Sequence, residues 1–257
     1  MKSIYKKVEI SFFFVLLIFL SLISGLFKDI ICFFLVIIIH EMGHVIISLI
    51  LRWKIKSVKL GICGGYIVYD EIIDKPFFEE FLISISGIVF QIIFFVICTL
   101  LLSKELINDE LYLIIKKYHY AILIFNLLPI IPLDGSKILS IILNKFVSYN
   151  KSLYISSFIS GLFLLLSFIF CLCTNQVQCS NFMILFFLID SLIKYVSDIP
   201  YLYNKFILER YLYPKKFKRN KYVKNSNLKK MKRQTSNYFY DVNRYHSERE
   251  VLKKRFD

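Results

Sequence analysis

The stretch FLVIIIHEMGHVIISLIL, residues 34–51, combines an apolar run of membrane-spanning length with three ionisable side chains at its centre. These side chains are His40, Glu41 and His44. An ionisable residue near the middle of a bilayer costs roughly 2.5–3.5 kcal/mol on insertion scales, and such residues usually have a function. The stretch therefore predicts a membrane helix whose polar residues have a specific partner.

The composition predicts a polytopic membrane protein. Of 257 residues, 57% are hydrophobic, and the mean hydropathy is +0.60. We predict an all-α fold of about six transmembrane helices in residues 1–199, since each apolar run has close to the ~20 residues that cross the hydrocarbon core. The first run is expected to stay as an anchor, because no small-x-small cleavage site follows it. The runs are residues 10–27, 31–51, 81–102, 119–143, 153–174 and 181–196.

Positive charge is concentrated at one end of the chain. The formal net charge is +14, and residues 200–257 contain 17 lysines and arginines against 5 acids. Alternate loops are also rich in lysine, so the positive-inside rule places both termini in the cytoplasm. We expect residues 200–257 to form a basic cytoplasmic tail that is attracted to the lipid bilayer. Nucleic acid is not expected as a partner, because the tail contains no recognisable binding module.

A short β element is predicted after the second apolar run, at about residues 53–69. WKIKSVKL, residues 53–60, alternates polar and apolar residues at the period of a strand. Glycines interrupt the pattern at positions 61, 64 and 65, and YIVY follows as a second β-prone run. Strand edges cannot face lipid unpaired, so this hairpin is expected to pack against helices or line a wet cavity.

The fourth apolar run is predicted to be a broken helix. It contains NLLPIIPLDG at residues 126–135, with Pro129 and Pro132 inside the run. Proline removes a backbone donor and clashes with the preceding turn, so the helix should break between residues 128 and 135. Irregular backbone at this depth must be buried in protein or wetted by a cavity. We therefore expect the polar groups of this segment to meet those at residues 40–44.

His40, Glu41 and His44 form an H-E-x-x-H pattern on a predicted helix. Residues four positions apart share one helix face, so both imidazoles can bind one metal ion while the glutamate lies beside it as a general base. The competing explanation is a pair of histidines that only make interhelical hydrogen bonds. The clustering of three polar groups at one depth favours a zinc site.

A catalytic zinc usually has three protein ligands and an open position for water. Asp134 is the favoured third ligand, because it is a carboxylate near the middle of another apolar run and lies in broken backbone. Asp190 is the competitor, although Lys194 four residues later offers it an ion pair. His119 lies at a helix end and His246 in the tail, so neither is well placed.

HEMGH at residues 40–44, followed about ninety residues later by NLLPIIPLDG, resembles the site-2 protease family of intramembrane zinc metalloproteases. The resemblance implies that His40, His44 and Asp134 bind one zinc ion per chain. It also implies that Glu41 is the catalytic base of a metalloendopeptidase that acts in regulated intramembrane proteolysis.

Asn126 is a further candidate catalytic residue. Its amide either stabilises the developing oxyanion or caps the broken backbone. GGY at residues 64–66 resembles the membrane-associated β element of the family, which is thought to present an extended substrate. Gly64, Gly65 and Tyr66 are therefore predicted to contact substrate.

SGIVFQ at residues 86–91 departs from the Gly-Pro-x-x-Asn pattern that is common in the next helix of the family. Ile88 stands in place of the proline and Gln91 in place of the asparagine. Because glutamine keeps the amide function with a longer reach, Gln91 is also predicted to contact substrate.

The predicted function is hydrolysis of a peptide bond in or near a membrane-associated segment of a regulatory protein, with regulatory membrane proteins as further partners. The compact layout and short appendage resemble the bacterial sporulation branch of the family, that of stage IV sporulation protein FB, which acts on a membrane-associated pro-sigma factor. A transporter with an intramembrane metal or proton site is the alternative, because broken helices also occur in transporters. A third possibility is an inactive homologue that acts as a scaffold.

Overall fold

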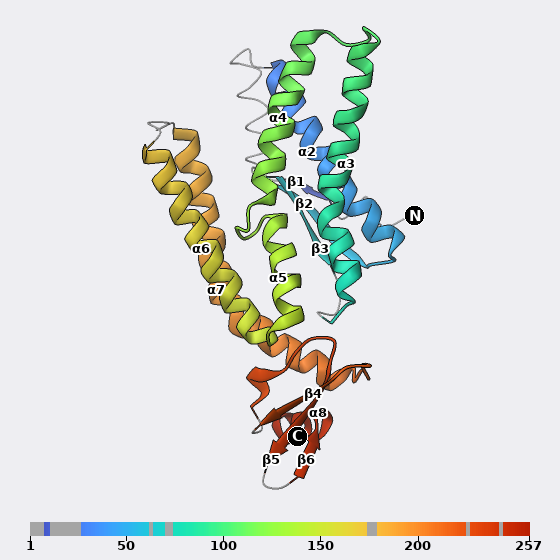
Figure 1. Ribbon diagram of the computed structural model, residues 1–257, viewed down its shortest axis with the longest axis vertical. Helices are drawn as coiled ribbons and strands as arrows, with labels where there is room; N and C mark the ends of the chain where they lie inside the picture. Colours follow the sequence, from blue (N-terminus) through green and yellow to red (C-terminus); the bar gives the residue numbers. More distant parts are fainter. Residues whose placement is uncertain are drawn as a thin grey trace. The chain divides into compact units, whose positions relative to one another are not determined.

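The computed structural model describes residues 8–10, 27–61, 64–69, 74–173, 179–224, 227–241 and 244–257 (Figure 1). The chain divides into two compact units, residues 1–71 with 81–127, and residues 72–80 with 128–257. Each unit has its own hydrophobic cluster. Most of the first predicted membrane run, residues 10–27, lies outside the described residues.

The first unit is built on three helices, α2 (Phe27–Ile50), α3 (Phe77–Ser103) and α4 (Asp109–Leu127). The start of α3 belongs to the second unit. These helices bury apolar side chains against one another because their apolar residues recur at helical spacing. The cluster consists of Cys32, Val36, Ile37, Cys98, Ile115 and Ile122.

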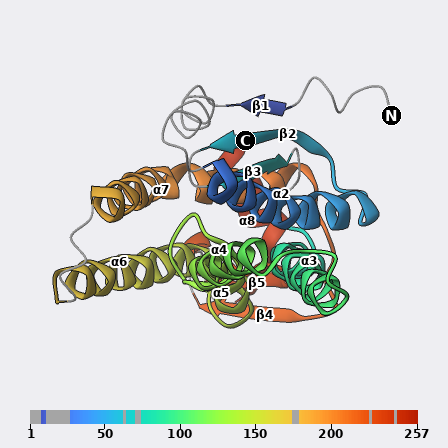
Figure 2. The same cartoon turned by 90° about the horizontal axis from the view of Figure 1, so that it is seen from above.

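The predicted β element is confirmed. Strands β2 (Ile55–Gly61) and β3 (Gly64–Tyr69) pair antiparallel, and β1 (Val8–Ile10) pairs parallel with β2 on the other side. Figure 2 shows the three strands side by side with β2 in the middle. The hairpin packs on α2, where the Tyr69 hydroxyl lies 2.8 Å from Ser48 Oγ, and the Tyr69 ring meets Trp53, between α2 and β2, edge-on. Within the described residues, β3 is therefore an edge strand.

The second unit contains the predicted break in the fourth apolar run. Helix α4 ends at Leu127 and α5 (Asp134–Phe146) begins at Asp134, so residues 128–133 are not helical. The backbone in this break is hydrogen-bonded, because Ser160 Oγ of α6 (Tyr149–Cys173) accepts from the Ile131 amide and donates to the Pro129 carbonyl. The prolines thus end one helix, and a serine of another helix replaces part of the lost bonding.

Helices α6 and α7 (Cys179–Leu212) run side by side (Figure 1). Helix α7 continues through Pro200 to Leu212 and is longer than the predicted apolar run at residues 181–196. The described helices that are long and apolar enough to cross a membrane are α2, α3 and α6. The count of six spans and the cytoplasmic placement of both termini stay predictions.

The first residues of the basic tail, 200–212, continue α7, and residues 220–257 contain a small three-stranded sheet and one helix. In this sheet β5 (Ser236–Asp241) lies between β4 (Asn220–Lys224) and β6 (Arg244–Ser247). A short 3-10 helix, η2 (Leu228–Lys230), connects β4 to β5 along the chain. Helix α8 (Glu248–Phe256) is capped at its N-terminus by Ser247, whose side chain accepts a hydrogen bond from the Glu250 amide. The apolar side chains of this sheet share a core with α6 and α7. The cluster contains Val223, Met231, Phe239 and Leu252 together with Tyr149, Leu153, Phe206 and Ile207.

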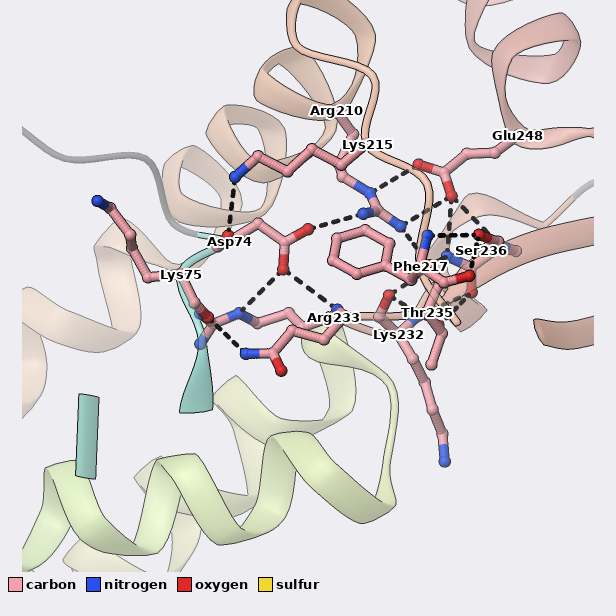
Figure 3. A network of polar contacts seen from close by, with 12 residues as sticks. Asp74, Lys75, Arg210, Lys215, Phe217, Lys232, Arg233, Thr235, Ser236 and Glu248 are labelled. Carbon is pink, nitrogen blue, oxygen red and sulfur yellow. Dashed lines mark hydrogen bonds and ion pairs between the residues drawn. The ribbon is translucent and has the colours of Figure 1, made fainter. Parts of the chain in front are cut away.

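A buried network of polar contacts joins this sheet to Asp74, Lys75 and the end of α7 (Figure 3). An ion pair between Arg233 and Glu80 extends this network to α3. The guanidinium of Arg210 donates to both carboxylate oxygens of Glu248, at 2.7 and 2.9 Å, and to Asp74 at 2.7 Å. Arg233 donates to both oxygens of Glu80. Burial alone would lower the pKa of Arg233, but the negative charges of Glu80 and Asp74 outweigh burial and raise it. All five charged side chains lie in the second unit.

Candidate metal centre

Helix α2 presents His40 and His44 on its buried face, where their exposed fractions are 2% and 5%. The two residues are four positions apart, so their rings lie one helical turn from each other. Their Nε2 atoms are 3.2 Å apart and their ring planes are inclined by 79°. The structure therefore brings the two histidines of the predicted metal site together.

The environment of His44 fixes the position of its ring proton. Its Nδ1 atom lies 2.7 Å from the carbonyl oxygen of Ile83 and 3.3 Å from Ser86 Oγ, both on α3. The Ser86 hydroxyl itself donates to the Ile83 carbonyl, at 2.7 Å. A carbonyl only accepts, so Nδ1 is the donor and the Nε2 lone pair is directed toward His40.

His40 has a matching partner on its other nitrogen. Its Nδ1 atom lies 3.1 Å from Oε1 of Gln91, a residue of α3 with an exposed fraction of 0%. Histidines that bind metal almost always donate the second ring nitrogen to an oxygen acceptor. Both histidines meet this requirement.

Glycines let α3 approach the histidines closely. A Cβ atom on Gly43 of α2 would lie 2.6 Å from the Ser86 carbonyl oxygen. A Cβ atom on Gly87 of α3 would lie 2.4 Å from Nε2 of His44 and 2.7 Å from Nε2 of His40. Gly43 thus allows α2 and α3 to pack closely, and Gly87 keeps the space beside both Nε2 atoms open.

This donor set fits zinc. Tetrahedral zinc with Zn–N bonds of 2.0–2.1 Å separates two ligand nitrogens by about 3.3 Å. The Nε2 atoms of His40 and His44 are 3.2 Å apart in the structure. Two neutral imidazoles that direct lone pairs at each other across this distance repel, and a shared cation turns the repulsion into ligation.

Asp134 is the first residue of α5, and its exposed fraction is 4%. One carboxylate oxygen accepts a hydrogen bond from Lys137 Nζ at 2.8 Å, on the next turn of the helix. The residue belongs to the second unit, whereas both histidines belong to the first. Its assignment as third zinc ligand stays a prediction.

The alternative ligands have other partners. Asp190 forms the ion pair with Lys194 that its spacing predicts, at 2.6 Å. His119 is buried in α4 with its ring stacked on Phe95 at 4.2 Å between centroids. His246 lies 3.2 Å from Glu250, and this hydrogen bond lowers the Glu250 pKa.

The remaining predicted site residues lie in the first unit. Glu41 follows His40 on α2 and is half-buried, as is Asn126 in the last turn of α4. Gly64, Gly65 and Tyr66 pair with Gly61, Leu60 and Lys59 across the hairpin. The catalytic role of Glu41 and Asn126, and substrate binding by Gly64, Gly65, Tyr66 and Gln91, stay predictions.

Residues of α3 that surround the histidines were not all foreseen. Ile83, Ser86 and Gly87 contact the imidazoles alongside Gln91. The available signal is their spacing, because positions 83, 87 and 91 recur every four residues on one face of a helix. Ser86, Gly87 and Gln91 are the small and polar residues that interrupt the apolar sequence of α3 there.

Known proteins resemble the chain in sequence and fold. It is 32% identical over 192 residues to stage IV sporulation protein FB of Bacillus subtilis. The matched region covers 75% of this chain and 67% of that protein. It is 26% identical over 125 residues to a Synechocystis protein described as a candidate zinc metalloprotease, which covers 47% of this chain and 33% of the relative. No family model matches the chain.

A solved structure, the site-2 protease of Methanocaldococcus jannaschii, superposes with a TM-score of 0.55. The match has 25% sequence identity and covers 73% of this chain and 89% of that one. The likeness thus extends from local motifs to the arrangement of helices.

Proposed function

The chain belongs to the site-2 protease family of zinc metalloproteases, and we propose that it hydrolyses a peptide bond in or near a membrane-spanning or membrane-associated segment of a regulatory protein. As a member of this family it is a metalloendopeptidase. We further propose that the protein crosses the bacterial cell membrane several times, with both termini in the cytoplasm.

The observation that carries the proposal is the histidine pair on α2. Both Nε2 atoms lie within 3.2 Å of each other, and each Nδ1 has an oxygen acceptor. His40 and His44 would hold one zinc ion per chain, with Asp134 as the third ligand. A carboxylate is a suitable third ligand, because two histidines and one acid form an established set for hydrolytic zinc.

When bound, zinc supplies a Lewis acid that polarises the scissile carbonyl and lowers the pKa of its water. Glu41 takes the proton from the attacking water and later delivers it to the departing amine. Asn126 donates a hydrogen bond to the carbonyl oxygen as negative charge develops there. The buried faces of α2 and α3 limit access of bulk water to the imidazoles, which strengthens these electrostatic interactions.

Substrate is proposed to bind as an added strand on β3. A peptide bond within a helix is shielded, so the substrate must be extended locally before it is cut. Within the described residues, β3 pairs only with β2, and β1 occupies the other side of β2. Backbone groups of Gly64, Gly65 and Tyr66 would pair with the substrate, as in other cases of strand addition.

A membrane-associated pro-sigma factor is the proposed substrate class. This assignment rests on the similarity to stage IV sporulation protein FB, of which the chain covers 67%. An anti-sigma factor is the competing regulatory substrate, and a transport function has no specific observation in its favour.

The test uses the full chain, purified in detergent and mixed with a tagged pro-sigma factor from the same genome. We expect cleavage at one site, identified by mass spectrometry, and none with Glu41→Gln. Glu105→Gln, at an exposed acid between α3 and α4, is the matched control and should cleave normally. Cleavage that persists in Glu41→Gln would contradict the proposed base. If the chain cleaved an anti-sigma factor and not the pro-sigma factor, the proposed substrate class would be wrong.

A further inference from the structure

We propose that Gln91 is a positioning residue for zinc, which holds His40 with the proton on Nδ1 and the lone pair of Nε2 directed at the metal. The inference rests on the proposed function, because it assigns a role toward the zinc ion at His40 and His44. It differs from the predicted substrate contact of Gln91, since the amide acts on a metal ligand.

The orientation of the Gln91 amide follows from its partner on α4. Its Nε2 atom lies 2.8 Å from the carbonyl oxygen of His119 and 3.4 Å from Nδ1 of the same residue. A carbonyl cannot donate, so the atom facing it is the amide nitrogen. The amide oxygen then faces His40.

This orientation dictates the tautomer of His40. The amide oxygen can only accept, so the Nδ1 atom of His40, at 3.1 Å, carries the proton. The neutral ring therefore has its lone pair on Nε2, the atom that lies 3.2 Å from Nε2 of His44. Gln91 thus selects the ring form that can bind a metal.

The position of His119 is itself fixed by packing. Its ring stacks on Phe95 of α3, with 4.2 Å between centroids and 6° between planes. A hydrogen-bonded path consequently runs from α2 through α3 to α4, by way of His40, Gln91 and His119. Each member has an exposed fraction of 3% or less.

Side-chain length and charge explain why glutamine suits this position. A shorter asparagine at position 91 would not reach both His40 and the His119 carbonyl from the same backbone. A neutral amide also avoids placing an ion in a site with no exposed surface, which is costly without a paired charge. Acceptors that orient metal-binding histidines typically contribute 10–100-fold to metal affinity.

The test compares zinc affinity by chelator competition in Gln91→Met and Gln91→Glu. Methionine has a similar shape and no amide, so zinc affinity should fall about 10–100-fold. Protonated glutamate can donate to the His119 carbonyl and keeps an oxygen that accepts from His40 Nδ1, so the zinc affinity of this variant should stay close to that of the unaltered protein. The visible spectrum of the Co²⁺-substituted protein should change in Gln91→Met and be preserved in Gln91→Glu.

Cys98→Ala is the control, because Cys98 is buried on the same helix as Gln91, two turns further along, and belongs to the apolar cluster that contains Cys32. Its zinc affinity should not change. If Gln91→Met does not fold, Gln91→Asn provides the second variant, with the same expected loss of affinity. The role of Gln91 would be overturned if the methionine or asparagine variant bound zinc as tightly as the unaltered chain. It would also be overturned if the glutamate variant lost as much zinc affinity as the methionine variant. Absence of zinc binding in the unaltered chain would instead refute the proposed function.

Discussion

Gly87 of α3 faces His44 of α2 so closely that a Cβ atom on Gly87 would lie 2.4 Å from the Nε2 atom of the imidazole. Real Cβ atoms do not come this near to a ring nitrogen, so one of the two must move. His44 is held at its other nitrogen by the Ile83 carbonyl at 2.7 Å. The absence of a side chain at position 87 is therefore a condition for two histidines to point at one metal ion.

Gly87→Ala is predicted to abolish zinc binding while the protein still folds. Alanine stabilises a helix relative to glycine by about 1 kcal/mol, so any loss arises from the displaced imidazoles. Zinc content of the purified variant measures the effect, and proteolytic activity should fall with it. Gly161→Ala is the control, because a Cβ atom there meets nothing nearer than Leu192, at 3.7 Å. Full zinc content in Gly87→Ala would contradict this account.

Gly43→Ala is predicted to destabilise the first unit. Its Cβ atom would lie 2.6 Å from the backbone oxygen of Ser86 and 3.0 Å from Cβ of Phe90. These atoms belong to α3, so the helices must separate, at a cost of about 1–3 kcal/mol. A lower midpoint of thermal unfolding in detergent is the expected result. An unchanged midpoint would show that the crossing of α2 and α3 is looser than described.

Arg210→Met is predicted to detach the C-terminal sheet. The substitution leaves the buried Asp74 and the half-buried Glu248 without the guanidinium that holds them, and breaking the buried Arg210–Asp74 pair costs about 3–5 kcal/mol. Limited proteolysis should then cut between residues 213 and 257 much faster than in the unaltered chain. The control is Lys28→Met, which removes an exposed ion pair with Glu110. Equal proteolysis rates in both variants would show that the ion pairs of Arg210 do not hold the C-terminal sheet in place.

The pH dependence of the C-terminal sheet is predicted to involve Lys221. Burial, together with the nearby ammonium groups of Lys232, Lys151 and Lys230, lowers the Lys221 pKa to about 8. Between that value and the ordinary pKa of about 10.4, the unfolded chain binds more protons, so this group makes the sheet more stable as pH rises. The stability difference between Lys221→Met and the unaltered chain should shift across this window and be constant below it. A pH-independent difference would contradict the lowered pKa.

The sequence predicted the local features of the fold because each depends on neighbouring residues. Pro129 and Pro132 interrupt helical bonding directly, and the break between Leu127 and Asp134 follows. The alternation in residues 53–60 likewise predicted β2. By contrast, the Arg210–Asp74 pair joins residues 136 positions apart, and no local pattern foretells such a contact.

The candidate site shows the same division. His40 and His44 meet because they are one turn apart on a single helix, which spacing alone predicts. That Ile83 supplies a carbonyl to His44, and Gln91 an amide to His40, depends on how α3 crosses α2. The replacement of an asparagine by Gln91 was visible in the sequence, but its partners on α2 and α4 were not.

The central claim, that His40 and His44 hold a catalytic zinc ion, is tested most directly by the metal content of the purified chain. Zinc per polypeptide should be measured by mass spectrometry of the metal for the unaltered chain, His44→Ala and Glu41→Gln. We predict close to one zinc ion in the unaltered chain and in Glu41→Gln, and almost none in His44→Ala. Equal zinc content in the His44→Ala variant and the unaltered chain would contradict the account.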